Sequence, residues 1–255
     1  MVLYNELAKI PVFNINDVIN MVGNEKTSYS IIYRLMKKDL VKKIRNNIYS
    51  VVNPATGDII ANPYQIACAI SSSAYISYHS AFEYYGLTNQ VYYEIYVSSE
   101  NRFNNFTYNN IHYKYVASKI SEGVVFAQNT IGVRLTDLER TVIDSIQYLN
   151  KIGGIEELIN ALDEITFLEE SKLLKYLKLY EIQGLYQKAG FLLEHYQEKM
   201  NLSDEFIQYC KAKVKKSRKY LVSNLQIDNY YNNEWNLMVP KGLFEINNYG
   251  GDIIV

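Results

Sequence analysis

The chain has 255 residues, of which 48% are hydrophobic and 21% charged, and its formal net charge is −1. These values exclude global disorder and a uniformly basic surface, and the length suits two or three packed domains. The positive charge is local: residues 1–60 contain eight Lys and Arg against five Asp and Glu, residues 61–150 contain five against seven, and residues 151–255 contain 13 against 15.

Two short helices are predicted at the start of the chain. The first covers residues 2–9 and ends before Pro11. The second has an N-cap at Asn14 or Asn16 and ends at Gly23, the residue type that most readily takes the left-handed conformation after a helix.

A third helix is predicted to begin at Thr27 or Ser28 and to continue for about three turns. With 100° per residue, one face carries the apolar side chains of Ile31, Ile32, Leu35 and Met36. The opposite face carries hydroxyl and cationic side chains, those of Thr27, Ser30, Arg34, Lys37 and Lys38. The first face is expected to pack, and the second to meet solvent or a partner.

A two-stranded hairpin is predicted next, with strands at residues 41–45 and 48–52 joined by Asn46 and Asn47. Asn tolerates positive φ angles, so this pair suits the centre of a tight turn. Helices followed by such a hairpin are typical of a winged helix-turn-helix. In that fold the last helix enters the major groove of DNA, and the hairpin, or wing, contacts the DNA backbone.

Seven Lys and Arg residues, but only one acid, lie between Lys26 and Arg45. A basic helix face is often merely solvated, and winged helices also bind proteins. Here, however, the helix and the hairpin are basic on surfaces that a winged helix presents together, which favours double-stranded DNA as the partner. The candidate DNA-binding residues are Lys26, Thr27, Ser28, Ser30, Tyr33, Arg34, Lys37, Lys38, Lys42, Lys43, Arg45, Asn46 and Asn47. Tyr49, on a strand beside Ile48, is expected to lie in the core.

A small α/β domain is predicted for the middle of the chain. It begins with a helix that has Asn62 before it and Pro63 at its first position. Residues 74–87 suggest a short strand and then a helix, capped by Ser77 or Ser80 and ended by Gly86. Three further segments have the β-branched and aromatic composition of strands, namely residues 91–99, 110–116 and 123–135.

The last helix of this domain is predicted to start with a capping box formed by Thr136 and Glu139. Its buried stripe is expected to contain Leu138, Val142, Ile146 and Leu149. Arg140 and Asp144 are spaced to form an ion pair. The acids Asp137, Glu139 and Asp144 could also form a catalytic cluster, but helix capping explains them without any chemistry.

The C-terminal part is predicted to be mainly helical, with an extended terminal segment. Its four helices are expected at residues 155–165, 171–182, 184–197 and 203–221, followed by strands and loops at 220–245. The last helix ends in a basic run from Lys211 to Lys219, which the helix dipole favours. The run is either a solvated helix end or a second contact for nucleic acid or another partner. The complete prediction is a mixed α/β protein with a winged helix at 1–56, an α/β domain at 57–150 and a helical domain at 151–255.

The sequence contains no pattern of catalytic residues. His79, His112 and His195 are scattered, and there is no phosphate-binding loop, dinucleotide-binding motif or nucleophile motif. Glu94 and Glu100 lack the neighbouring lysine of a nuclease site. We therefore expect no enzyme activity, no catalytic residues, no metal ligands and no cofactor.

The two cysteines, Cys68 and Cys210, are predicted to be core thiols in a reducing compartment, because their spacing fits neither a disulfide framework nor a zinc site. No signal peptide and no apolar run of membrane-spanning length is present. The expected location is the cytoplasm, with no membrane partner.

Three motifs follow the winged-helix segment, which ends in RNNIYSVV. The first contains Ser77, Ser80, Ala81, Gly86 and Leu87. The second contains Glu139, Arg140, Thr141 and Asp144. The third contains Trp235, Asn236, Leu237, Val239 and Pro240. In this order they resemble the AbiEi family of antitoxins from type IV toxin-antitoxin systems, over nearly the whole chain.

The resemblance implies an antitoxin that represses its own operon by binding inverted repeats through the winged helix. It also implies that the remaining domains counteract a co-encoded nucleotidyltransferase-like toxin, in some systems as phage defence by abortive infection. Type IV antitoxins are held not to need a stable toxin complex, so direct contact with the toxin stays open. Two alternatives are a stand-alone transcriptional regulator that senses a ligand in its middle domain, and an enzyme whose C-terminal domain acts as a kinase or nuclease on the toxin or its target.

Overall fold

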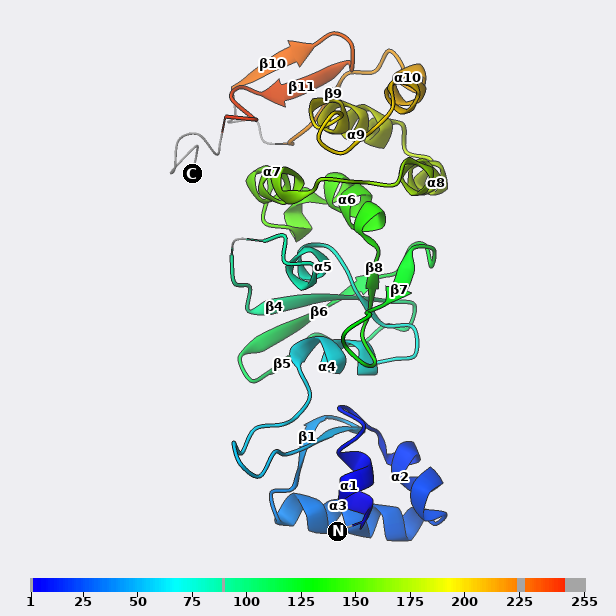
Figure 1. The fold of residues 1–255 in the computed structure, drawn as a ribbon, viewed down its shortest axis with the longest axis vertical. Coiled ribbons are helices and arrows are strands. Elements are labelled where there is room, and N and C mark those ends of the chain that lie inside the picture. Colours follow the sequence, from blue (N-terminus) through cyan, green and yellow to red (C-terminus); the bar gives the residue numbers. More distant parts are fainter. Residues whose placement is uncertain (1, 89, 224–227, 246–255) are drawn as a thin grey trace. The chain divides into compact units, whose positions relative to one another are not determined.

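The structure, a computed structural model, describes residues 2–88, 90–223 and 228–245. It has the mixed α/β fold that the sequence predicted (Figure 1). The chain forms two compact units. Unit 1 comprises residues 1–76, 92–119 and 124–135, and unit 2 comprises residues 77–91, 120–123 and 136–255. The predicted ranges 1–56, 57–150 and 151–255 cut across these units, because the middle segment contributes to both.

Unit 1 begins with three helices and a hairpin, in the order of a winged helix. The elements are α1 (Val2–Leu7), α2 (Ile15–Val22), α3 (Glu25–Lys37), β1 (Val41–Arg45) and β2 (Ile48–Val51). Their common core contains Leu7, Phe13, Ile15, Val18, Ile32, Val41, Tyr49 and Val51. Ile32 of α3 lies in this core, and Leu35 and Met36 pack against it, so the predicted hydrophobic side of α3 does face the core.

The ends of these helices follow the capping signals in part. Asn14 caps α2 in a box with Asp17, and Gly23 ends this helix with a φ angle of 77°. The predicted start of α3 at Thr27 or Ser28 is wrong, because the side chain of Asn24 accepts the Thr27 N–H at 2.9 Å and the helix begins at Glu25.

The hairpin turn uses only one of the two asparagines as a left-handed residue. Asn47 has a φ angle of 59°, and its Oδ1 accepts the N–H of Ile15 at 3.0 Å. The register shifts between Lys43 and Arg45, which marks a β-bulge beside the turn. In addition, Phe13 and Tyr49 exchange two backbone hydrogen bonds, so the segment before α2 extends the hairpin by one bridge.

The rest of unit 1 is a mixed sheet of six strands in the order β5-β6-β4-β3-β8-β7. The strands are β3 (Tyr75–Ile76), β4 (Glu94–Ser99), β5 (Phe106–Tyr108), β6 (Ile111–Ala117), β7 (Val124–Phe126) and β8 (Arg134–Thr136). Helix α4 (Pro63–Ala69) has the expected Asn62 cap and packs against β3 and β4. The single strand predicted for residues 123–135 is wrong: it is two short strands, separated by a loop in which Gly132 has a φ angle of 78°.

Unit 2 is mainly helical and ends in a small sheet. Its helices are α5 (His79–Tyr84), α6 (Leu138–Gln147), α7 (Ile155–Glu164), α8 (Glu170–Tyr180), α9 (Gln183–His195) and α10 (Asp204–Ala212), with a 3₁₀ turn η1 (Leu149–Lys151). Helix α6 packs against α5, α8 and α9, and α9 packs against α10. The strands β9 (Lys219–Tyr220), β10 (Asn229–Asn232) and β11 (Leu237–Pro240) pair in the order β10-β11-β9. Parts of the predicted terminal extended segment, residues 224–227 and 246–255, lie outside the described residues.

Two predicted caps in unit 2 are wrong. Helix α5 is not capped by Ser77 or Ser80, which are both buried; its N-cap is Tyr78, with a φ angle of 57°. Helix α6 is capped by Asp137, whose carboxylate accepts the Arg140 N–H at 2.8 Å, because the preceding Thr136 belongs to strand β8.

Helix α6 carries a buried polar network. Arg140 Nε donates to Asp144 at 3.3 Å, so the predicted ion pair is confirmed, and both side chains are almost fully buried. Tyr180 also donates to Asp144, and Tyr176 donates to Asp137. The carboxylates of Asp137 and Asp144 therefore form structural contacts inside unit 2, in agreement with the interpretation that explained these acids without catalysis. Of the predicted stripe, Val142 and Ile146 are fully buried and Leu138 and Leu149 only half-buried.

The predicted helix over residues 203–221 is also wrong, because α10 ends at Ala212. Ser203 caps the helix as expected, with its Oγ accepting the Phe206 N–H at 3.1 Å. Beyond Ala212 the chain has five cations in seven residues, whose mutual repulsion opposes a helix. Over the described ranges, no helix combines the length and apolar character needed to cross a membrane.

Candidate nucleic-acid interface

The exposed side of α3 presents cations and hydroxyls, as its period predicted. Lys26, Thr27, Ser30, Arg34, Lys37 and Lys38 are all exposed. The side chains are ordered by local contacts, since Ser30 Oγ donates to the Lys26 carbonyl at 3.0 Å and Arg34 Nε donates to the Ser30 carbonyl at 3.3 Å. Tyr33 is 59% exposed on the same helix, with the Lys37 ammonium 5.0 Å from its ring centre. Several hydrogen-bond donors are therefore exposed together on one side of α3.

The first strand of the wing adds two exposed lysines to this basic region. Lys42 Nζ donates to the Gly57 carbonyl at 2.7 Å, and Lys43 Nζ donates to Asn46 Oδ1 at 3.1 Å. Both acceptors are neutral oxygens, so these hydrogen bonds do not neutralise the positive charge of the two ammonium groups. Asn46 and Asn47 are themselves exposed at the turn, although Asn47 Oδ1 is engaged by the backbone of α2.

The cations of α3 and of the wing have no carboxylate partner among the described residues. None of the seven from Lys26 to Arg45 forms a salt bridge within the part of the chain that the structure describes. Elsewhere in unit 1, by contrast, Lys9 is paired with Glu6 and Lys114 with Glu94. Carboxylates of the described residues therefore do not neutralise the basic charge that the sequence predicted, and lysine and arginine side chains of this kind are the groups that contact phosphates in protein–DNA complexes.

Two of the predicted DNA-binding residues have other roles. Ser28 is fully buried and donates its hydroxyl hydrogen to the Asn24 carbonyl at 2.8 Å, because its position on α3 faces the core. Arg45 is only half-exposed, and its guanidinium lies 4.8 Å from the ring centre of Phe106 and 5.5 Å from that of Phe103. Ser28 is thus a packing residue, and Arg45 contacts aromatic side chains on and just before strand β5.

Of the tyrosines near this surface, one is buried in the core and others are exposed. Tyr49 is buried and stacked on Phe13 with ring centres 5.9 Å apart, as expected for a core residue, and burial raises the pKa of its hydroxyl. Tyr29 was not predicted, but it is 52% exposed on α3, one turn before Tyr33. Its spacing of four residues from Tyr33 is the signal that would have identified it.

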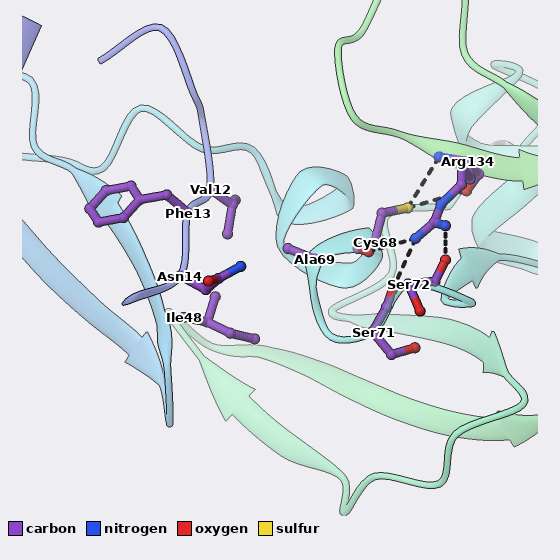
Figure 2. A pocket seen from close by; sticks show the side chains of 9 residues that line it. All are labelled: Val12, Phe13, Asn14, Ile48, Cys68, Ala69, Ser71, Ser72 and Arg134. Atoms are coloured by element: carbon purple, nitrogen blue, oxygen red, sulfur yellow. Dashed lines mark hydrogen bonds between the residues drawn. The ribbon is translucent and has the colours of Figure 1, made fainter. Parts of the chain in front are cut away.

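Unit 1 also contains a pocket of about 330 Å³ (Figure 2). Its walls are formed by Val12, Phe13, Asn14, Ile48, Cys68, Ala69, Ser71, Ser72 and Arg134. The guanidinium of Arg134 is held by the carbonyls of Cys68, Ser71 and Ser72 (Figure 2). Burial raises the pKa of the Cys68 thiol to about 11, so it is protonated at neutral pH and a poor nucleophile. The pocket could hold a small ligand, but its groups point to no reaction.

A metal site is not indicated. Among the residues that the structure describes, no three His, Cys, Asp or Glu side chains come close enough together to bind an ion. Cys68 and Cys210 are both buried and unpaired, in agreement with the prediction of core thiols.

The comparisons with known proteins give a fold and no family. No protein-family model matches the chain, and no curated protein matches it. Among solved structures, the crystal structure of the RV2827C protein from Mycobacterium tuberculosis is similar, with a TM-score of 0.67 and 14% sequence identity over 97% of this chain and 94% of that chain. At this identity the similarity shows a shared fold and says nothing about a shared function.

Proposed function

We propose that this chain is a cytoplasmic antitoxin of the AbiEi type, which binds the DNA of its own promoter through the winged helix and counteracts a co-encoded nucleotidyltransferase-like toxin. The observation that supports DNA binding is the set of exposed cations on α3 and β1, which form no ion pair with any carboxylate that the structure describes. The antitoxin part rests on the order of the three sequence motifs after the winged helix. Direct contact with the toxin is not required by this proposal.

Replacing Lys42 and Lys43 together by Ala should weaken binding to a duplex that spans the chain's own promoter. Each phosphate contact contributes about 0.9 to the slope of log K against log salt for duplex DNA, so the slope should fall by roughly 2. The measurement is a fluorescence-anisotropy titration at four salt concentrations. A random duplex should show the same loss, because phosphate contacts carry no sequence information.

The matched control is a variant with Lys9 and Lys114 replaced by Ala. Both lysines belong to unit 1 but are already paired with carboxylates. Their removal should leave the salt slope unchanged. An unaltered slope in the Lys42 and Lys43 variant would show that the wing does not contact the DNA.

The toxin-directed part is tested separately by co-expression. The full-length Lys42 and Lys43 variant, produced from an unrelated promoter, should still protect cells from the nucleotidyltransferase encoded beside it, while it no longer represses its own promoter in a reporter strain. Loss of both activities would mean that protection depends on DNA binding, and absence of protection by the unaltered chain would refute the antitoxin assignment.

A second function, a ligand-sensing transcriptional regulator, is favoured by the pocket of unit 1. Its walls combine Phe13 and Ile48 of the winged helix with Cys68 and Arg134 of the adjoining sheet domain, so an occupant would touch both. Genomic context separates the two functions, because a regulator has no adjacent nucleotidyltransferase gene.

A further inference from the structure

The basic segment after α10 is not a solvated helix end. Lys211, the one member inside the helix, is neutralised by Glu194 at 2.7 Å and Glu234 at 2.6 Å. The later cations are exposed and form no salt bridge in the described parts of the chain, and these are Lys213, Lys215, Lys216, Arg218 and Lys219. Because these five residues lie after the end of α10, a favourable interaction with the helix dipole does not explain the whole basic run.

The backbone of this segment is anchored by side chains from other elements. Gln187, which is fully buried in α9, donates to the Ser217 carbonyl at 3.3 Å. Asn236 Nδ2 donates to the Lys215 carbonyl at 3.0 Å, and Gln183 Nε2 donates to Ser217 Oγ at 3.4 Å. The segment is therefore held in place while its cations remain exposed.

Two of these cations, Lys213 and Lys215, line a groove of about 290 Å³ in unit 2, together with Lys178 of α8. Its walls come from the ends of α8, α9 and α10, and they comprise Lys178, Glu181, Gln183, Tyr186, Tyr209, Lys213 and Lys215. This volume is at the small end of ligand pockets, which span roughly 300–1,000 Å³ and are usually more apolar. Three lysines and one glutamate give the lining a net positive charge.

The centre of the groove is aromatic. The ammonium groups of Lys178 and Lys213 each lie 5.2 Å from the ring centre of Tyr209. The ring of Tyr186 lies next to it, with centres 6.4 Å apart. A planar group that enters the groove can thus stack on a tyrosine while its negative charge meets two lysines.

The same pairing of cation and aromatic ring continues along the segment. The Arg218 guanidinium lies 4.8 Å from the ring centre of Tyr231, which is itself exposed. The aliphatic part of Lys219 lies against Gly184 in the first turn of α9. Pairs of a cation and a tyrosine ring therefore occur both at the groove and at strand β10.

We propose that this surface binds single-stranded nucleic acid, with one base stacked on Tyr209 and adjacent phosphates on Lys178, Lys213 and Lys215. A positively charged groove with aromatic platforms is the arrangement that binds unpaired strands without strong sequence preference. Duplex DNA does not fit this arrangement, because its base faces are covered by stacking. An acidic peptide would use the lysines but has no group for the tyrosine face.

The test is binding of fluorescein-labelled 12-nucleotide strands to the full-length protein, measured by anisotropy. One arm uses a uridine-rich RNA, one the matching DNA strand, and one a duplex of the same sequence. Replacing Lys178, Lys213 and Lys215 by Ala should reduce the slope of log K against log salt for the single strands by about 2, at 0.7 per contact. Tyr209→Leu should weaken binding by roughly 5- to 150-fold, whereas Tyr209→Phe, which keeps the stacking face, should bind normally.

The control is Lys175→Ala, because Lys175 is an exposed lysine of α8 that does not line the groove. It should leave single-strand binding unchanged. Preference for the RNA or for the DNA strand identifies the natural source of the ligand. The proposal is overturned if the unaltered protein does not bind single strands, if the groove variants bind them normally, or if only duplex binding is lost.

Discussion

Replacing Asp144 by Ala is expected to lower the free energy of unfolding of unit 2 by about 3–5 kcal/mol, the cost of leaving a buried charge without its partner. Asp144 is almost fully buried in α6, where its carboxylate accepts hydrogen bonds from Arg140 and Tyr180. Burial raises the pKa of this carboxyl, and the two donors oppose the shift. Without the carboxylate, the Arg140 guanidinium, which also donates to the Glu122 carbonyl, stays inside the unit and loses this ion-pair partner.

Urea denaturation followed by the fluorescence of Trp235 measures this loss, because the single tryptophan is buried in unit 2. The double variant Arg140→Met with Asp144→Leu should be less harmful than Asp144→Ala, since apolar side chains of similar size leave no buried charge. Asp228→Ala serves as the control, because Asp228 forms an exposed ion pair with Lys241 and should change stability by less than about 1 kcal/mol. A loss below 1 kcal/mol for Asp144→Ala would contradict the importance of the buried pair.

Local signals identified most helices, but they did not always identify the capping residue. Helix ends were predicted correctly at Asn62 with Pro63 and at the glycines 23 and 86, because few other residues near these positions can cap or end a helix. At the start of α6, Thr136 and Asp137 are both good caps. The choice is made by tertiary structure, since strand β8 pairs with β3 through Leu135 and Ile76 and extends through Thr136.

The exposed polar side of α3 could be predicted for a similar reason. A helical period places Lys26, Ser30, Arg34 and Lys37 on one side whatever the rest of the chain does. The role of Arg45 could not be predicted, because the rings that it contacts lie about 60 residues later in the sequence, Phe106 on the edge strand β5 and Phe103 just before it.

The groove of unit 2 was hidden from the sequence by distance along the chain. Lys178 lies on α8 and Lys213 lies just after the end of α10, and only the fold brings both of them to Tyr209. The basic run from Lys211 to Lys219 could be seen in the sequence, but a continuous helix with these cations at its C-terminal end already explained their charge. The end of α10 at Ala212 removes that explanation.

Replacing Gly190 by Ala is expected to lower the free energy of unfolding of unit 2 by about 1–3 kcal/mol, although helix propensity alone predicts a gain of about 1 kcal/mol. Gly190 lies inside α9, where an added Cβ would be 2.2 Å from the indole ring of Trp235 and 3.1 Å from Cys210 Cβ. The indole cannot move away easily, because it is fully buried and its Nε1 donates to Glu194 at 2.7 Å.

The control in the same helix is Gly184→Ala, whose added Cβ would meet only the flexible side chain of Lys219 at 3.6 Å. This variant should be neutral or stabilising, so the two glycine substitutions should have opposite signs. A double-mutant cycle with Trp235→Phe, followed by circular dichroism, locates the cause. If the indole is the obstacle, Gly190→Ala should cost less in the Trp235→Phe background, because phenylalanine lacks the outer ring of the indole. An equal cost in both backgrounds would show that the close approach of α9 to Trp235 is not what requires a glycine.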